Sequence, residues 1–239
     1  MATRNTRLAY AGALSGLFVL LVWPVIFSGR AGADEATDQA TYHEPLILKM
    51  AADWPHVDLV NTGGTAMAPT YHAFFAAFMH YAGCGIQGLR WINSFFGLAL
   101  VLAVFWYSTK WTDDRTAFML CLPFLFSSFM LGSAIWLRTD DVAWLFVVIA
   151  LVAASMFPSR PKRIVANGLA AAAATAVRQI HLWLIAPIIA ASFLELFPGS
   201  FPSLQPSQAT ASPRRASIAV CTLLAILGPA VVLGYFVSI

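Results

Sequence analysis

The chain has 239 residues, of which 59% are hydrophobic and only 10% are charged, and its formal net charge is +3. Since soluble domains carry about 25% charged residues, this composition indicates a polytopic membrane protein and gives no reason to expect nucleic acid as a partner. The three cysteines lack metal-ligand spacing, so we interpret them as small buried hydrophobes: Cys84, Cys121 and Cys221.

We expect one all-α transmembrane domain over residues 1–239. The N-terminus also fits a cleaved signal peptide, but its apolar run exceeds the 7–15 residues or so of a signal core, which favours a retained helix. In chain order the predicted segments are span 8–28, outer loop 29–65, spans within 66–197 that include an interrupted segment at 116–137, cytoplasmic loop 198–215 and last span 216–239.

Basic residues near span ends mark the cytoplasmic side. Arg4 and Arg7 therefore place the N-terminus inside and the acidic first loop outside. That loop contains "HEPLILKMAADW", a pattern typical of a short amphipathic helix. The apolar stretch 66–83 is expected to return to the inside, which suits Arg90.

The basic run "SRPKR" after residue 158 would then fall outside if 116–137 crossed once. The conflict disappears if 116–137 is a broken hairpin that dips into the membrane and returns. Pro123, the Ser127–Ser128 pair and Gly132 are typical of an interrupted membrane segment. Under this interpretation "RTDD" faces outside and "SRPKR" faces inside.

Three polar clusters are thereby predicted to meet at the outer face. An Arg can bind a phosphate through two hydrogen bonds, and a carboxylate can accept a proton from an attacking hydroxyl. Two alternatives stay open, namely mutual neutralisation of Arg138 with an adjacent Asp and ordinary solvation of the first acidic pair. The clusters are Asp34 with Glu35, Arg138 with Asp140 and Asp141, and Arg178 with Gln179 and His181.

Residues 33–187 resemble the N-terminal half of the GT-C class of polyprenyl-phosphate-sugar-dependent membrane glycosyltransferases. The likeness is greatest to the dolichyl-phosphate-glucose-dependent α-1,2-glucosyltransferase family. Its Pro-Gln-Ala-Gln run is replaced here by "ATDQATYH", and its Pro-Pro-Gly element is lost. The matching residues are Asp34–Glu35, Trp54–Pro55, Pro69, Tyr71, Leu89–Arg90, Asn93, Thr139–Asp140, Arg178–Gln179 and Trp183.

The resemblance implies a GT-C-like helix bundle and transfer of a hexose, with inversion, from a polyprenyl-phosphate or dolichyl-phosphate donor to a glycan acceptor at the outer or lumenal face. It also implies site roles: Asp34 as base with Glu35 assisting, Arg178 and then Arg138 on the donor phosphate, and Asp140, Gln179 and His181 toward the acceptor. No metal is required, although a divalent cation would fit through Asp34, Glu35 and Asp140.

Members of that family are about twice this long, so a partner chain supplying the C-terminal spans is one expectation. The membrane would be the endoplasmic reticulum in a eukaryote and the inner membrane in a bacterium. Two other functions compete with sugar transfer, a truncated non-catalytic membrane subunit and a secondary transporter. The remaining histidines receive no role: we interpret His72 and His80 as part of an aromatic belt, and His43 and His56 as solvated loop residues.

Overall fold

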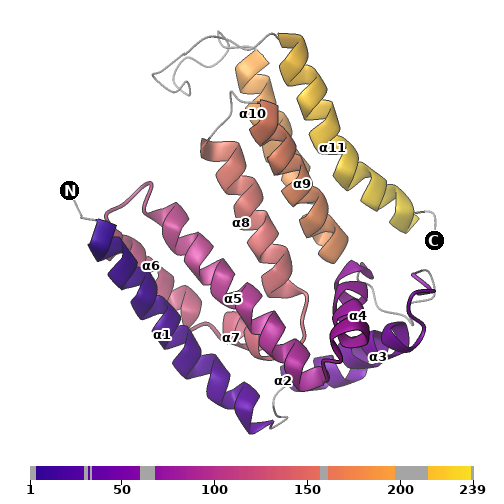
Figure 1. The fold of residues 1–239 in the computed structure, drawn as a ribbon. Helices are drawn as coiled ribbons and strands as arrows, with labels where there is room; N and C mark the ends of the chain where they lie inside the picture. Colours follow the sequence, from indigo (N-terminus) through magenta and orange to yellow (C-terminus); the bar gives the residue numbers. More distant parts are fainter. Residues whose placement is uncertain are drawn as a thin grey trace. The chain divides into compact units, whose positions relative to one another are not determined.

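The computed structural model describes residues 4–29, 32, 34–59, 68–156, 161–196 and 215–237. All regular structure in these residues is helical, as predicted. The elements, shown in Figure 1, are α1 (Arg4–Ser28), α2 (Asp34–Asp38), the π-helical turn η1 (Gln39–His43), α3 (Glu44–Ala52), α4 (Thr70–Ala82), α5 (Ile86–Ser108), α6 (Asp114–Leu125), α7 (Ser128–Ile135), α8 (Asp140–Met156), α9 (Pro161–Val177), the 3₁₀ turn η2 (Gln179–Leu184), α10 (Ile185–Leu196) and α11 (Arg215–Val237).

The chain divides into two compact units, residues 1–145 and 146–239. The first contains α1 to α7 and the start of α8, and the second contains the rest of α8 together with α9 to α11. Each unit is described by itself below. The predicted cytoplasmic loop 198–215 lies outside the described residues except for Arg215.

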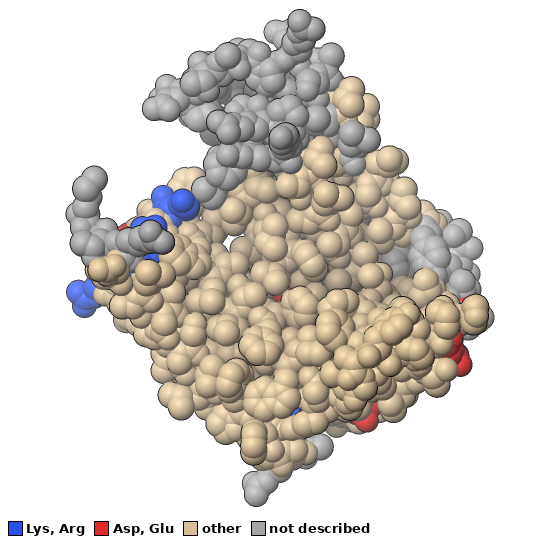
Figure 2. Space-filling view, in the orientation of Figure 1, with Lys and Arg blue, Asp and Glu red and all other residues tan. Residues whose placement is uncertain are grey.

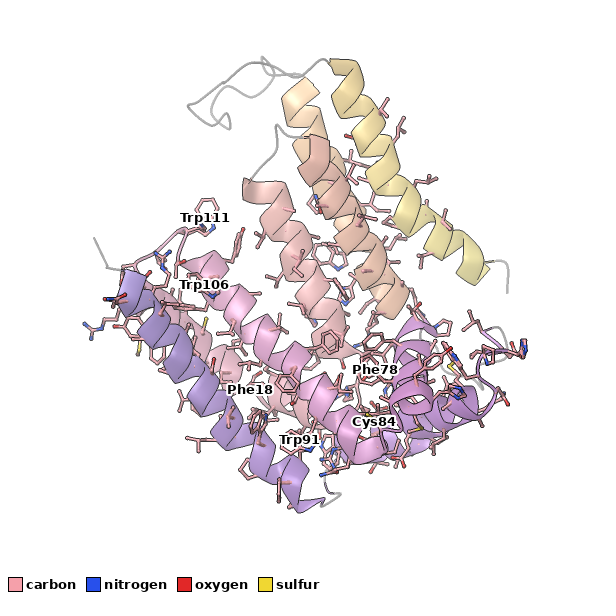
Figure 3. All side chains as sticks on the ribbon, in the orientation of Figure 1. Phe18, Phe78, Cys84, Trp91, Trp106 and Trp111 are labelled. Carbon is pink, nitrogen blue, oxygen red and sulfur yellow. The ribbon has the colours of Figure 1, made fainter. Side chains whose placement is uncertain are left out.

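Two helices in the described chain, α1 and α5, are long and apolar enough to cross a membrane, with 24 and 23 residues in their candidate spans. They lie side by side and run in opposite directions (Figure 1). The ring centroids of Trp23 and Trp91 are 5.2 Å apart, whereas the Arg7 guanidinium lies 5.7 Å from the ring centre of Trp106. Figure 3 labels Trp91 and Trp106 near opposite ends of α5. We call the end with Trp23 and Trp91 the loop end, and the end with Arg7 and Trp106 the basic end.

The segment between α1 and α5 therefore returns to the end at which it started. α4 has 13 residues, about 20 Å at 1.5 Å per residue, which is short for a hydrocarbon core of ~30 Å. It packs on α3 and touches α5, where the ring centroids of Phe74 and Phe96 are 6.0 Å apart. The prediction that 66–83 carries the chain across, and leaves Arg90 at the opposite end, is wrong. Arg90 lies at the loop end, where its Nε donates to the carbonyl of Ile135.

The helices α6 and α7 form a pair bent by 70°. α6 begins at the basic end, where Arg7 forms a 2.8 Å ion pair with Asp114, and α7 ends at the loop end beside the start of α5. The pair thus runs along α1 and α5 from one end of the unit to the other. The predicted interruption in 116–137 is confirmed, but the prediction of a hairpin that returns to its starting end is wrong.

Local sequence explains the break between α6 and α7. Pro123 lies in the last turn of α6 and removes the hydrogen bond that an N–H there would donate to the Met119 carbonyl, which weakens the helix just before the break. Ser127 then starts α7, because its side-chain oxygen accepts from the Met130 N–H at 3.2 Å. α6 itself begins after Asp113, whose side chain accepts from two backbone N–H groups of the first turn.

In the second unit, α9 and α11 run parallel and approach closely through small residues. A Cβ placed on Gly168 would lie 2.2 Å from the Cα of Ala225, and one on Gly228 would lie 2.7 Å from the Cβ of Ala172. Small residues of this kind let membrane helices pack backbone to backbone. Ala170, Ala171 and Ala174 of this Ala-rich helix belong to the buried core of the unit.

Large apolar side chains remain exposed along the outer faces of the helices. On α1, Leu20 is 71% exposed and Phe27 is 83% exposed. Figure 2 shows that the visible surface of the described residues is mostly uncharged. A surface of this kind suits contact with lipid better than contact with water.

Candidate functional site

Five ionisable side chains gather at the loop end of the first unit, and we call them the loop-end cluster. They come from three parts of the chain that are distant in sequence: the α2–η1 turn, the start of α4 and the connection between α7 and α8. The members are Asp38, His43, His72, Arg138 and Asp140.

A π-helical turn places Asp38 and His43 on the same side of the backbone. The turn closes through hydrogen bonds of five-residue spacing, such as that from the Glu44 N–H to the Gln39 carbonyl. As a result His43 Nε2 lies 3.5 Å from Asp38 Oδ2. The side chains of Gln39 and Glu44 have the same spacing and are joined by a 3.1 Å hydrogen bond from Gln39 Nε2. Turns of this type are frequent at functional sites.

Arg138 joins two carboxylates. Its Nε lies 3.2 Å from Asp38 Oδ2, and one of its terminal nitrogens lies 3.3 Å from Asp140 Oδ2. Asp140 is almost fully buried, whereas the side chain of Asp38 is 28% exposed. Both ion-pair contacts of Asp38 in the described chain involve Oδ2.

The two histidines of the cluster form a buried pair. His43 Nδ1 and His72 Nε2 are 2.9 Å apart, and the side chains are 1% and 0% exposed. Burial, and then the neighbouring His43, lower the pKa of His72 from its ordinary 6.5 to about 3. His72 is therefore neutral at physiological pH.

Buried hydrogen bonds fix the backbone around the cluster. Asn93 of α5 donates both amide hydrogens, to the carbonyls of Ser133 and Trp136, and accepts from the Tyr71 hydroxyl at 3.0 Å. The Leu137 N–H donates to the side chain of Gln39 at 2.9 Å. These hydrogen bonds connect α4, α5, η1 and the residues before Arg138, and they hold the backbone segments that carry the loop-end cluster.

The acidic pair predicted as base and assistant does not act as a unit. Asp34 is exposed. Glu35 is half-buried against α7, where a Cβ on Gly132 would lie 2.9 Å from its Cγ. Both residues lie on α2, the helix that ends at Asp38, so the first loop meets the second predicted cluster at the loop end, through a residue outside the predicted pair. The contact between them is made by Asp38 and Arg138.

The third predicted cluster belongs to the second unit. Arg178 is an extended residue between α9 and η2, and its carbonyl accepts from the His181 N–H at 3.1 Å. His181 is 1% exposed, and Gln179 is partly buried. The meeting of this cluster with Asp34 and Arg138 remains a prediction.

Metal binding finds no support in the described part of the chain. There, no three His, Cys, Asp or Glu side chains lie close enough to hold a metal ion. Asp34 is exposed, Glu35 packs on Gly132 and Asp140 pairs with Arg138, so these side chains have different surroundings. Any need for a divalent cation stays a matter for experiment.

Sequence reasoning missed Asp38, His43 and His72 as site residues. We had interpreted His72 and His80 as parts of one aromatic belt. His72 does not fit this interpretation because it is buried, whereas His80 is exposed and contacts the Ala51 carbonyl. One signal was present in the sequence. In "DQATYHEP" a carboxylate and a His stand five residues apart, directly before α3, which begins at Glu44 and has Pro45 in its first turn.

Comparison with known proteins found no match. The chain matches no protein-family model, no curated protein and no solved structure.

Proposed function

We propose that this protein transfers a sugar from a polyprenyl-phosphate donor to a glycan acceptor at the loop end of its first unit. The observation that carries this proposal is Asp38, a partly exposed carboxylate whose Oδ2 lies 3.2 Å from Arg138 and 3.5 Å from His43. A base held in this way is what the attack of a hydroxyl group on a sugar carbon requires. The resemblance of residues 33–187 to the GT-C glycosyltransferases supports the same reaction class.

The proposed orientation puts the loop end outside the cytoplasm. Arg7, Lys110 and Arg115 belong to the basic end, and basic residues near span ends favour the cytoplasmic side. The acids of α2 then face the outer or lumenal side. In this orientation α1, α5 and the bent pair α6–α7 are three crossings of a multi-pass membrane protein.

The proposed reaction is a single displacement. The acceptor hydroxyl oxygen bonds to the sugar C1, the bond from C1 to the phosphate oxygen breaks, and the hydroxyl proton passes to the Asp38 carboxylate. The departing lipid phosphate keeps the electron pair of the broken bond and needs a cation nearby. We assign this role to Arg138, the cation that lies beside Asp38 in the same unit; the role that the resemblance implies for Arg178 stays a prediction.

The experiment compares two carboxylates of the same short helix. The full chain, reconstituted in lipid vesicles, is given polyprenyl-phosphate glucose or polyprenyl-phosphate mannose and a lipid-linked glycan, and transferred sugar is measured. We expect Asp38→Asn to lower kcat by about 100-fold or more, and Asp34→Asn, at an exposed position of α2, to keep kcat within about threefold.

Two other outcomes would change the assignment of the base or the proposed function itself. Loss of activity in Asp34→Asn with normal activity in Asp38→Asn would return the base to Asp34, as the family resemblance implies. No transfer from either donor by the folded wild-type chain would overturn the proposed function and favour a non-catalytic membrane subunit.

A further inference from the structure

Helix α4 has no charged side chain on any of its faces, although it does not cross the first unit. Its 13 residues include no Asp, Glu, Lys or Arg. One face is buried in the protein and contains Tyr71, His72 and Phe75. The opposite face carries exposed aromatic side chains. A helix that is apolar all round belongs in a protein core or in a membrane, so this exposed face needs a partner other than water.

Three aromatic residues form the exposed face, and we call them the α4 stripe: Phe74, Phe78 and Tyr81. They lie on one side of the helix because residues three and four apart share a face. The rings of Phe74 and Phe78 have centroids 5.0 Å apart and both are exposed, and Tyr81 is 73% exposed. Figure 3 labels Phe78. Contiguous exposed apolar side chains mark surfaces that bind protein or membrane.

The α4 stripe continues the exposed apolar surface of α5. The ring centroid of Phe74 lies 6.0 Å from that of Phe96 on α5, and the neighbouring Phe95 is exposed. Phe96 follows Trp91 by five residues, about 7.5 Å along the helix, and Trp91 with Trp23 marks the loop end. Phe74 therefore lies beside a part of α5 that is inside the candidate span, beyond the tryptophans of the loop end.

Polar groups are found at the other end of the α4 stripe. Trp54 Nε1 donates to the Tyr81 hydroxyl at 2.8 Å, and His80 Nδ1 lies 3.3 Å from the Ala51 carbonyl oxygen. Trp and Tyr, with an apolar ring and a polar tip, concentrate at the boundary between hydrocarbon and headgroups. The α4 stripe thus has phenylalanines beside the span and a hydrogen-bonded Trp–Tyr pair at its end, as a helix that enters one leaflet requires.

We propose that α4 enters the leaflet at the loop end without crossing it and that the α4 stripe contacts lipid. Lipid fits better than a partner protein, because the stripe is continuous with the surface of α5 and ends in a Trp–Tyr boundary. The opposite face of α4 holds His72 of the loop-end cluster and Tyr71, whose hydroxyl donates to Asn93. Insertion of α4 therefore keeps the cluster near the lipid headgroups, where a lipid-linked phosphate lies.

The experiment measures what surrounds single positions. The full chain, with its native cysteines replaced, carries a nitroxide at one introduced cysteine and is reconstituted in lipid vesicles. Collisions of the nitroxide with oxygen, which concentrates in hydrocarbon, are compared with collisions with a water-soluble nickel complex. Phe95→Cys on α5 is the reference for lipid, and His56→Cys in the first loop is the reference for water, since both positions are exposed.

We expect the nitroxide of Phe78→Cys to match that of Phe95→Cys within about twofold in both collision rates, and to meet nickel at least about fivefold less often than that of His56→Cys. A nickel collision rate at position 78 equal to that at position 56 would overturn the proposal, because the α4 stripe would then face water. Low collision rates with both reagents would also overturn it, because protein would then cover the stripe.

These measurements do not depend on sugar transfer. A chain that transfers no sugar but gives the expected collision rates would contradict the proposed function and leave the insertion of α4 standing.

Discussion

At the scale of single residues, His72 gives the folded chain a stability that depends on pH. Burial and the nearby His43 lower its pKa from 6.5 to about 3. Below pH 6.5 the unfolded chain binds a proton at this residue and the folded chain does not, so a falling pH favours unfolding until about pH 3. Between pH 6.5 and 5 the loss is about 2 kcal/mol. We expect the thermal unfolding midpoint of the wild type to fall over this range.

His72→Gln isolates this contribution from those of the other histidines. Gln does not titrate, so the stability advantage of the wild type over this variant should shrink as the pH falls from 6.5 to 5. Parallel pH dependences of the two unfolding midpoints would show that His72 is not protonated preferentially in the unfolded chain.

The residues of the loop-end cluster also show where sequence reasoning fails. An α-helix turns by about 100° per residue, which would put positions five apart on well separated faces, so Asp38 and His43 were not considered together. The π-helical turn changes that spacing and brings them within 3.5 Å. Arg138 and Asp140, in contrast, were predicted as site residues because charged groups between two apolar runs are expensive. They do lie together.

At the scale of elements, Gly97 sets how closely α5 and α7 approach. A Cβ at Gly97 would lie 2.9 Å from the Cβ of Ala134 and 2.8 Å from an oxygen of Asp141. Ala134 cannot move without its backbone, so we expect Gly97→Ala to cost about 1–3 kcal/mol through overpacking. The measurement is the free energy of unfolding in mixed micelles of mild detergent and SDS.

Gly132→Ala is the matched control on the facing helix. The three atoms nearest to its new Cβ all belong to the Glu35 side chain, at 2.9 Å from Cγ, and that side chain can turn away. We expect this variant to unfold within about 0.5 kcal/mol of the wild type. Equal losses in the two variants would mean that the α5–α7 approach is not set by Gly97.

The long helices were largely predictable, because a lipid-facing surface must be apolar over the whole span. The predicted span 8–28 lies within α1, and α5 lies in the region 66–197 that was predicted to hold further spans. The stretch 66–83 was misjudged because its aromatic residues serve packing: Tyr71 and Phe75 are buried. Arg90 then seemed to confirm the error, yet it is a buried packing residue whose guanidinium lies 4.1 Å from the ring centre of Trp136, and the positive-inside rule concerns solvated charges.

At the scale of the whole molecule, two errors in the predicted membrane crossings cancelled, so that residue 138 was still predicted at the correct end. The sequence interpretation counted 66–83 as a span and 116–137 as none, whereas the structure has α4 returning and α6–α7 traversing the first unit. In both the prediction and the structure, the chain makes an odd number of crossings before residue 138, so this residue lies at the loop end either way. The first loop and "RTDD" were therefore predicted at the same end for partly wrong reasons, and the Asp38–Arg138 contact confirms that they meet.

If α8 and α9 each cross once, the two crossings return the chain to the side of residue 138, and Arg178 is predicted to lie outside the cytoplasm. This can be tested by single cysteines in a chain whose native cysteines are replaced. Asp34→Cys represents the loop end, Lys110→Cys the basic end and Gln179→Cys the second unit. With a maleimide that does not cross membranes, added to sealed vesicles of known orientation, we expect positions 34 and 179 to react from one side and position 110 only from the other.

The result decides whether the predicted role of Arg178 on the donor phosphate can hold. Reaction of positions 179 and 110 from the same side would put Arg178 across the membrane from Asp38 and remove it from the proposed reaction. Reaction of positions 34 and 110 from the same side would contradict the crossing by α1 and α5 themselves. Arg178 can neutralise the departing phosphate only if position 179 shares its side with position 34, because the sugar carbon that the acceptor attacks is the same carbon that releases the phosphate.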